Sequence, residues 1–379
     1  MFLRQRLGEE VQALQARAGT RNAEAWSLVQ QAQVARNGVV TLLAAGDTAA
    51  ATRQLAQADS LLALAAEKDR RWITPVIDRG WVAYDQRRIV GLNRGSAAEW
   101  LGRGADFAAQ ALTIDPNAPE AKQLRGTMRY IRWLLNLDPA PLTMDRLLEV
   151  AEQDLRAGAD TANPNRASAM ALLAHLLLRK SATVEAKLVA AQAYESDPYL
   201  NEAAAVLERL YSASLDLEDA VEAARWCREG FRRFPKIPIF TECQISMYAL
   251  RGMKPDVPQL WRLLQQNTAL YPPNQQEYRR RRGQLLLAMA LGNAGQADSA
   301  RRVALRSRAD PDVDPTRDLV YVEMLLRNLL GDRDEAIELL TLYLATNPQD
   351  RGSLATDRTW WLRGLRDDPR FKALVGRGN

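Results

Sequence analysis

Apolar residues recur along this chain with the three- and four-residue spacing of an amphipathic helix, and no stretch alternates in the manner of a strand. The segment LLGDRDEAIELLTLYLATNP, ending at Pro348, shows this most clearly. A Gly-Asp pair at 331–332 predicts a turn, and Ala336, Leu340 and Tyr343 then share one helical stripe. A small alanine lets two helices approach closely, and proline stops the second one. The pattern therefore predicts a two-helix hairpin.

The same frame recurs in EAKLVAAQAYESDP, AARWCREGFRRFP and GADFAAQALTIDP, and a second Gly-Asp turn precedes TAAATRQLAQA. The spacing resembles that of the tetratricopeptide repeat (TPR), whose period is about 34 residues, with a few residues inserted. The prolines expected to end successive helices fall 37 to 39 residues apart, at Pro198, Pro235, Pro272, Pro311 and Pro348.

These patterns predict an all-α fold, a right-handed α-solenoid of about eight TPR-like helical hairpins. We expect an N-terminal helix within residues 1–20, hairpins over 21–138 and 139–350, and a C-terminal cap over 351–379. The stretch NLDPAPLT is the candidate for a bend between the two arrays, which would otherwise form one continuous solenoid. An unrelated, irregular helical bundle is the alternative.

Charge and residue chemistry argue against catalysis. The net charge of +5 is mild for 379 residues and comes mainly from arginine, so nucleic acid is a disfavoured partner. The single histidine, His175, lies among leucines and excludes motifs such as HExxH. Phosphate-binding loops and nucleophile elbows are also missing from the sequence. We therefore predict a protein that is not an enzyme and has no cofactor or metal site; a helical-toroid hydrolase is a remote alternative.

Two clusters are candidate sites. Four consecutive arginines, Arg279, Arg280, Arg281 and Arg282, would contact an anion or acidic peptide, or would simply be solvated at the start of a helix. The two cysteines, Cys227 and Cys243, flank a helix end at Pro235. They are expected to be buried free thiols, or alternatively a disulfide between adjacent hairpins; metal binding and redox catalysis are the least favoured interpretations.

Several stretches are similar to the TPR region of bacterial eukaryotic-like serine/threonine kinases. The resemblance rests on LATDRTWWLRGLRDDPRFKALVG, DLRAGADTANPNRASAMALLAHLL, WCREGFRRFPKIPIFTECQ and GTRNAEAWSLVQQAQ. It implies an interaction or sensory role in signalling, without the kinase domain. Carboxylate-clamp residues of peptide-binding TPR grooves are not found in the frame.

The predicted function is a scaffold or sensor region that binds a protein or peptide in a concave groove formed by first helices. A nucleic-acid-associated regulatory module is the alternative. The chain as written is expected to be cytoplasmic, or extracytoplasmic if it is a fragment of a membrane-anchored kinase, and no segment is apolar enough to insert in a membrane. The groove candidates by repeat frame are His175, Arg209, Asp318, Tyr321 and Asn328.

Overall fold

A computed structural model describes residues 19–91, 93–137, 140–250 and 252–376. The N-terminal helix expected within residues 1–20 lies almost entirely outside these residues. The described residues form α-helices, short 3-10 helices and connecting turns, with no strand among them. The chain divides into two compact units, residues 1–176 and 177–379. The all-α fold of TPR-like hairpins predicted from the sequence is confirmed.

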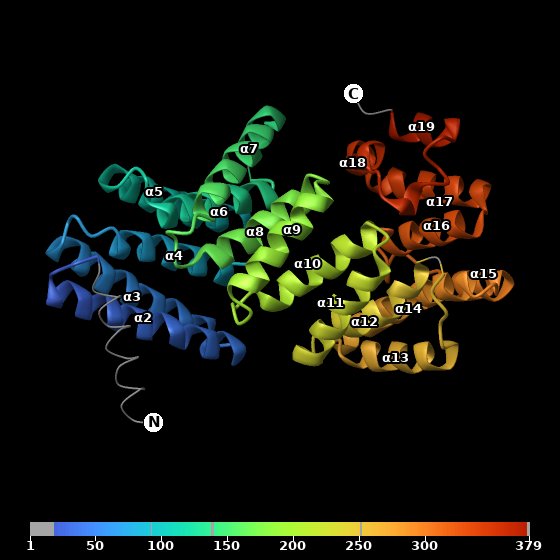
Figure 1. Cartoon of the computed structure of the whole chain (residues 1–379), viewed down its shortest axis with the longest axis horizontal. Coiled ribbons are helices and arrows are strands. Elements are labelled where there is room, and N and C mark those ends of the chain that lie inside the picture. Colours follow the sequence, from blue (N-terminus) through green and yellow to red (C-terminus); the bar gives the residue numbers. More distant parts are fainter. Residues whose placement is uncertain (1–18, 92, 138–139, 251, 377–379) are drawn as a thin grey trace. The chain divides into compact units, whose positions relative to one another are not determined.

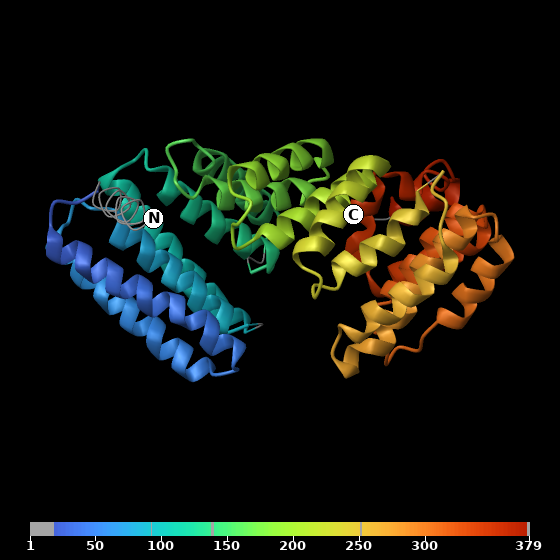
Figure 2. The same ribbon diagram turned by 60° about the horizontal axis from the view of Figure 1, so that its bottom comes forward.

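Unit 1 contains long helices that pair as hairpins, α2 with α3, α4 with α5 and α6 with α7. Figures 1 and 2 show α2 and α3 side by side. Alanine and leucine alternate on the buried stripe of α3, so its hairpin partner can approach closely. The helices are α2 (Ala23–Ala44), α3 (Thr48–Lys68), α4 (Thr74–Ile89), α5 (Arg94–Ile114), α6 (Pro119–Leu134), α7 (Pro141–Gly158) and α8 (Arg166–Arg179), the last of which contains the boundary between the units.

Unit 2 continues with shorter helices. Helix α9 packs against α10, and hairpins follow as α10 with α11, α12 with α13, α14 with α15 and α16 with α17. The first helices α10, α12, α14 and α16 also contact one another in that order. Their bounds are α9 (Thr183–Ser196), α10 (Ala203–Asp216), α11 (Ala220–Arg233), α12 (Ile239–Ser246), η1 (Met247–Ala249), α13 (Val257–Ala269), α14 (Pro273–Asn293), α15 (Ala297–Ser307), α16 (Asp318–Leu330) and α17 (Arg333–Thr346).

Left-handed residues mark the hairpin turns. Each of eight successive first helices is followed by one residue with positive φ, either glycine or a substitute for it. Only glycine adopts this conformation without steric cost. These residues are Gly46, Gly91, Asn136, Ser181, Glu218, Gly252, Gly295 and Gly331. The first three intervals are each 45 residues (46 to 91, 91 to 136 and 136 to 181), so the hairpins of unit 1 are longer than the frame read from the prolines.

A cap follows α17 and contacts the first hairpin of unit 2. Trp360 Nε1 donates to Leu215 O at 2.9 Å, and Trp361 Nε1 donates to Asp216 Oδ1 at 3.1 Å. Burial raises the pKa of Asp216 to about 6. The cap therefore joins the end of α10 to the last hairpin within this unit. It consists of η2 (Pro348–Asp350), α18 (Arg351–Thr356), η3 (Trp360–Leu362) and α19 (Pro369–Val375).

Within the described residues, we find no helix that combines the length and the apolar character needed to cross a membrane. The bend expected at NLDPAPLT includes residues 138 and 139, which are outside the described part of the chain.

Candidate binding face of unit 2

A row of charged and aromatic side chains crosses α10, α12, α14 and α16, which we call the first-helix face. Glu208 on α10 is an electrostatic neighbour of Glu242 on α12, and Glu242 pairs with Arg282 on α14. The next step is from Tyr278 on α14 to Asp318 at the start of α16. Four successive hairpins thus contribute to one surface.

The Glu242–Arg282 pair is at the centre of this face. The Glu242 side chain is 10% exposed and that of Arg282 is 28% exposed, and Arg282 Nη1 donates to Glu242 Oε1. Beneath them, the hydroxyls of Tyr211 and Ser246 are 2.7 Å apart and buried. A buried, paired carboxylate and guanidinium hold each other in place, which fixes the spacing between α12 and α14.

Glu208 has a different environment. Desolvation raises its pKa, the nearby Arg209 lowers it, and the like charge of Glu242 raises it further. Arg282 is already paired with Glu242. Arg209 is therefore the cation that lowers the pKa of Glu208 and offsets part of its negative charge. The α10 end of the face therefore presents a carboxylate whose charge is only partly compensated.

Arg279 is the most distinctive member of the arginine run. Its guanidinium carbon lies 4.6 Å from the ring centroid of Tyr271 and 5.3 Å from that of Tyr278. Its Nε is buried and has no hydrogen-bond partner in the described structure. Cation–π contacts on two rings position a guanidinium without neutralising its charge. Arg279 can therefore bind an incoming carboxylate or another anion.

The other three arginines have carboxylate partners. Arg280 and Arg281 both donate to Glu277, at 2.8 and 2.6 Å respectively, and Arg282 donates to Glu242. The four side chains point in different directions around α14, as consecutive helical residues must. The run therefore does not form one basic patch, and only Arg279 has a guanidinium without an acidic partner among the described side chains.

The groove candidates from the repeat frame fall in several environments. Arg209 lies half-buried on α10, and Asp318 is exposed at the first turn of α16, where Oδ2 accepts from the Thr316 hydroxyl at 2.7 Å. Tyr321, one turn later, packs its ring 4.9 Å from that of Tyr343, and burial raises its pKa. Arg209, Asp318 and Tyr321 all lie on first helices.

Asn328 holds the cap. Its Nδ2 donates to Trp361 O at 2.7 Å, and a Cβ at residue 364 would lie 2.3 Å from Asn328 Oδ1, so Gly364 permits the close approach. His175 belongs to unit 1, where its Nδ1 lies 3.1 Å from the hydroxyl of Tyr130 on α6, with the two rings edge to face. Neither residue adds to the first-helix face of unit 2.

Cys227 and Cys243 are bonded to each other, with Cα atoms 5.9 Å apart. The free thiols expected from the sequence are therefore not what the structure contains. The disulfide links α11 to α12, which belong to adjacent hairpins. No group of three or more metal-ligating side chains occurs in the described part of the chain.

Sequence reasoning missed the residues that give this face its geometry. Tyr271 lies before α14 and Glu242 lies 40 residues before Arg282, so neither is recognisable from local spacing.

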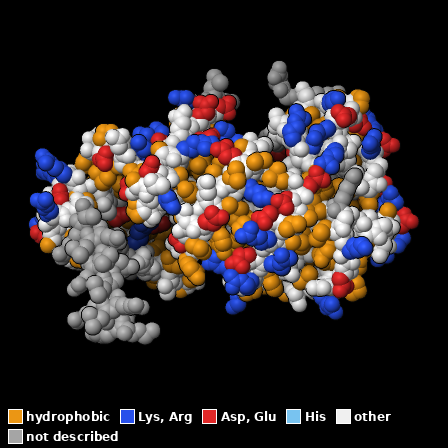
Figure 3. Space-filling model, in the orientation of Figure 1, with side chains coloured by type: hydrophobic (Ala, Val, Ile, Leu, Met, Phe, Trp, Pro, Cys, Tyr) orange, Lys and Arg blue, Asp and Glu red, His pale blue; other side chains and the backbone are white. Residues whose placement is uncertain are grey.

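Across the side of the molecule shown in Figure 3, basic and acidic side chains are interspersed. This distribution resembles a mixed interaction surface more than a phosphate-binding stripe.

Comparison with known proteins identifies no family. No protein-family model matches the chain, and no curated protein matches its sequence. Human IFIT1, described as a dimer with m7Gppp-AAAA, is similar at a TM-score of 0.40 and 12% identity over 94% of this chain and 86% of that chain. A tetratricopeptide repeat protein from Parabacteroides merdae ATCC 43184 is similar at a TM-score of 0.38 and 13% identity, over 80% of this chain and 98% of that chain. Similarity of this degree concerns the helical-repeat fold alone.

Proposed function

We propose that this chain is a non-enzymatic helical scaffold whose unit 2 binds a segment of a partner protein along the first-helix face. The observation that carries this proposal is Arg279, which Tyr271 and Tyr278 hold without neutralising its charge. At the α10 end, Glu208 supplies the opposite charge. The partner segment is therefore one that presents an acidic side chain to Arg279 and a basic side chain toward Glu208.

Selection from a random peptide display library with the intact chain tests this proposal. We expect enriched peptides to carry an acidic residue, and Arg279→Gln to weaken their binding about tenfold, as expected for the loss of one charge-assisted contact. Arg302→Gln is the matched control, because Arg302 is exposed on the second helix α15 and donates to Ser299. Photo-crosslinks confined to α11, α13 and α15 would contradict the assignment of the face.

The scaffold acts, in this proposal, in signalling linked to a serine/threonine kinase. The support is the sequence resemblance of four stretches, including the C-terminal LATDRTWWLRGLRDDPRFKALVG, to kinase-associated TPR regions. A kinase gene beside the gene for this chain, and co-purification of the two products, are the expected results. Binding to single-stranded RNA or DNA that weakens steeply with salt would instead favour the nucleic-acid alternative.

The disulfide bears on the compartment. Disulfides persist in oxidising compartments and are rare in the reducing cytosol, so the Cys227–Cys243 bond supports an extracytoplasmic location over the cytoplasmic one. Thiol alkylation of cell fractions tests this point. Protein whose cysteines resist alkylation until reductant is added is expected, and rapid alkylation of both thiols in freshly lysed cells would favour the cytoplasm.

A further inference from the structure

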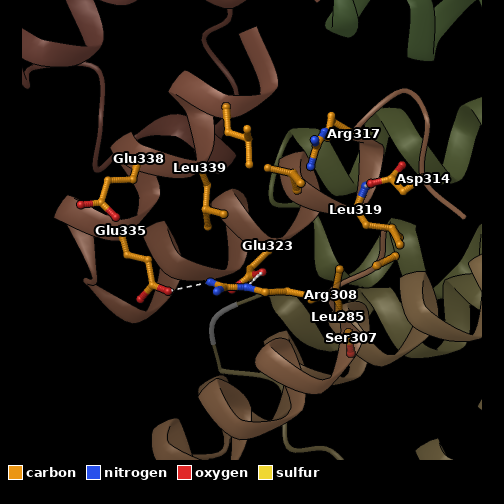
Figure 4. A pocket seen from close by; sticks show the side chains of 13 residues that line it. Leu285, Ser307, Arg308, Asp314, Arg317, Leu319, Glu323, Glu335, Glu338 and Leu339 are labelled. Carbon is orange, nitrogen blue, oxygen red and sulfur yellow. Dashed lines mark hydrogen bonds and ion pairs between the residues drawn. The ribbon is translucent and has the colours of Figure 1, made fainter. Parts of the chain in front are cut away.

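A cleft of about 300 Å³ lies between the α14–α15 hairpin and the α16–α17 hairpin of unit 2 (Figure 4). Helix α15 is only 11 residues long, and residues 308–317 connect it to α16. This connection is longer than the one between α11 and α12, residues 234–238. The short helix and long connection leave a space over α16 and α17 that the neighbouring hairpin does not fill.

Arg308 lines the cleft, and its guanidinium group reaches across to carboxylates on α16 and α17. Its Nε and Nη2 donate to the two carboxylate oxygens of Glu323 at 2.8 Å, and Nη2 also donates to Glu335 at 2.8 Å. The ion pairs extend through Arg327, whose side chain is 4% exposed. Three arginines and four acids form this network: Arg301, Arg308, Arg327, Asp298, Glu323, Asp332 and Glu335.

Arg317 is outside that network. It has no ion-pair partner in the described part of the chain, and Figure 4 shows its side chain pointing into the cleft toward Leu339. The nearby Asp314 carboxylate is occupied with the backbone N–H groups of Asp318 and Leu319, each at 2.9 Å. Glu338 lies at the rim and points away from Arg317. One cation without an ion-pair partner among the described residues therefore faces the cleft.

The backbone of Arg317 is also exceptional. Its φ is +59°, and it is the one left-handed residue of the described chain that does not lie in a hairpin turn. For a residue with a side chain this conformation costs about 1–2 kcal/mol. The apolar part of the lining comprises Leu285, Ala309, Leu319, Val320, Leu339 and Leu342, and Ser307 is the remaining neutral polar residue.

We propose that this cleft binds a small carboxylate with a branched or aryl apolar body, its carboxylate on Arg317 and its body on the leucines. A volume near 300 Å³ is at the lower limit of small-molecule sites, which are mostly apolar with a few oriented polar groups. Leu319 and Glu323 are on the opposite side of α16 from Asp318 and Tyr321, by helical geometry. None of the residues named on the first-helix face lines the cleft, so the two proposals can be tested separately.

Titration of the intact chain with isovalerate and phenylacetate tests the proposal, with isopentylamine and phenethylamine as cationic counterparts. We expect both carboxylates to bind by ligand-observed NMR and calorimetry, and the amines not to bind. Arg317→Asn should weaken the carboxylates at least about tenfold; asparagine tolerates a left-handed backbone, so this variant retains the fold. Leu342→Ser, at an exposed rim position, should weaken them several-fold.

Two control variants, Arg302→Gln and Arg279→Gln, show whether the probes bind in the cleft or elsewhere on the chain. Arg302→Gln removes an exposed arginine that does not line the cleft and should leave binding unchanged. Equal binding by Arg317→Asn, or equal binding of amines and carboxylates, would overturn the proposal. Loss of binding in Arg279→Gln with retention in Arg317→Asn would also overturn it, because the probes would then occupy the first-helix face.

Discussion

Two junctions between neighbouring hairpins of unit 2 are built by contrasting means. Between α11 and α12, residues 234–238 make a short turn, the Cys227–Cys243 bond crosses it, and Gly230 lets Phe240 pack directly on α11. Between α15 and α16, residues 308–317 make a long connection, and ion pairs cross a cleft. Apolar contact and a covalent bond link the first junction, which retains a smaller cavity of about 180 Å³, whereas ion pairs link the second one. The same repeat can therefore join its hairpins by a tight covalent link or by ion pairs beside a larger cleft.

The largest expected effect is at the α15–α16 junction. Glu323→Ala removes a carboxylate that is 3% exposed and leaves Arg327 buried with weaker compensation from Asp332 and Glu335. Breaking a buried pair in this way costs about 3–5 kcal/mol. Urea unfolding should show that loss, while Glu338→Ala, an exposed rim change, should stay within about 0.5 kcal/mol. If Glu323→Ala and Glu338→Ala both lowered the free energy of unfolding by a similar, small amount, the buried ion pairs would not stabilise this junction.

The disulfide is expected to have the next largest effect. Its 16-residue separation corresponds to about 3 kcal/mol of stabilisation in the chain-entropy account, so the double variant Cys227→Ala/Cys243→Ala should lose about that much free energy of unfolding. Reductant should lower the unfolding midpoint of the parent chain and leave the double variant unchanged. Native protein whose two thiols react immediately with an alkylating reagent would contradict the bond.

A single methyl group tests the packing of the α11–α12 junction. At Gly230 a Cβ would lie 2.1 Å from Phe240 Cδ1, and Phe240 is 1% exposed, so Gly230→Ala should destabilise by about 1–3 kcal/mol despite the better helix propensity of alanine. Gly352→Ala is the matched control, since no neighbour lies within 4 Å of its Cβ position; it should gain up to about 1 kcal/mol. If both variants behaved alike, close approach at Gly230 would not matter.

The smallest effect is the salt response of the α15–α16 junction. The Arg308 side chain is 46% exposed, and its buried partner Glu323 keeps the ion pair with Arg327, so Arg308→Gln should cost only about 1 kcal/mol at low ionic strength. The cost should shrink near 1 M NaCl, where the Debye length is about 3 Å. Thermal unfolding at two salt concentrations measures the difference. The Gly230→Ala effect provides the comparison and should not respond to salt.

The hairpins could be predicted from sequence because their signals are local. The sequence predicts that Ala336, Leu340 and Tyr343 share a packed stripe, and all three are buried. Two of the turns that define the 45-residue spacing, at Asn136 and Ser181, are not recognisable from the sequence because no glycine marks these left-handed positions. Glycine is favoured at such positions, but hairpin packing can impose the conformation on other residues.

The candidate sites were less accessible to prediction for a physical reason. The pairing of Glu242 with Arg282, and of Arg308 with Glu335, depends on which helices become neighbours and not on sequence spacing. The arginine run was visible in the sequence, but its division into three paired side chains and one held by tyrosines follows from the positions of Glu277, Glu242 and Tyr271. Contacts between residues far apart in the sequence therefore determine which charged side chains are paired, and the local periodicity of the sequence does not reveal them.

The contact between the cap and α10 has a consequence for biosynthesis. Trp360 and Leu215 are 145 positions apart, so their hydrogen bond cannot form until nearly the whole of unit 2 has emerged from the ribosome. Hairpins between them close over short loops and can form as they are synthesised, whereas closing a loop of this length carries a larger entropic cost and slows folding. The end of α10 therefore stays unsealed until Trp360 has been synthesised, and a nascent chain stalled before Trp360 should be cleaved by protease near Leu215.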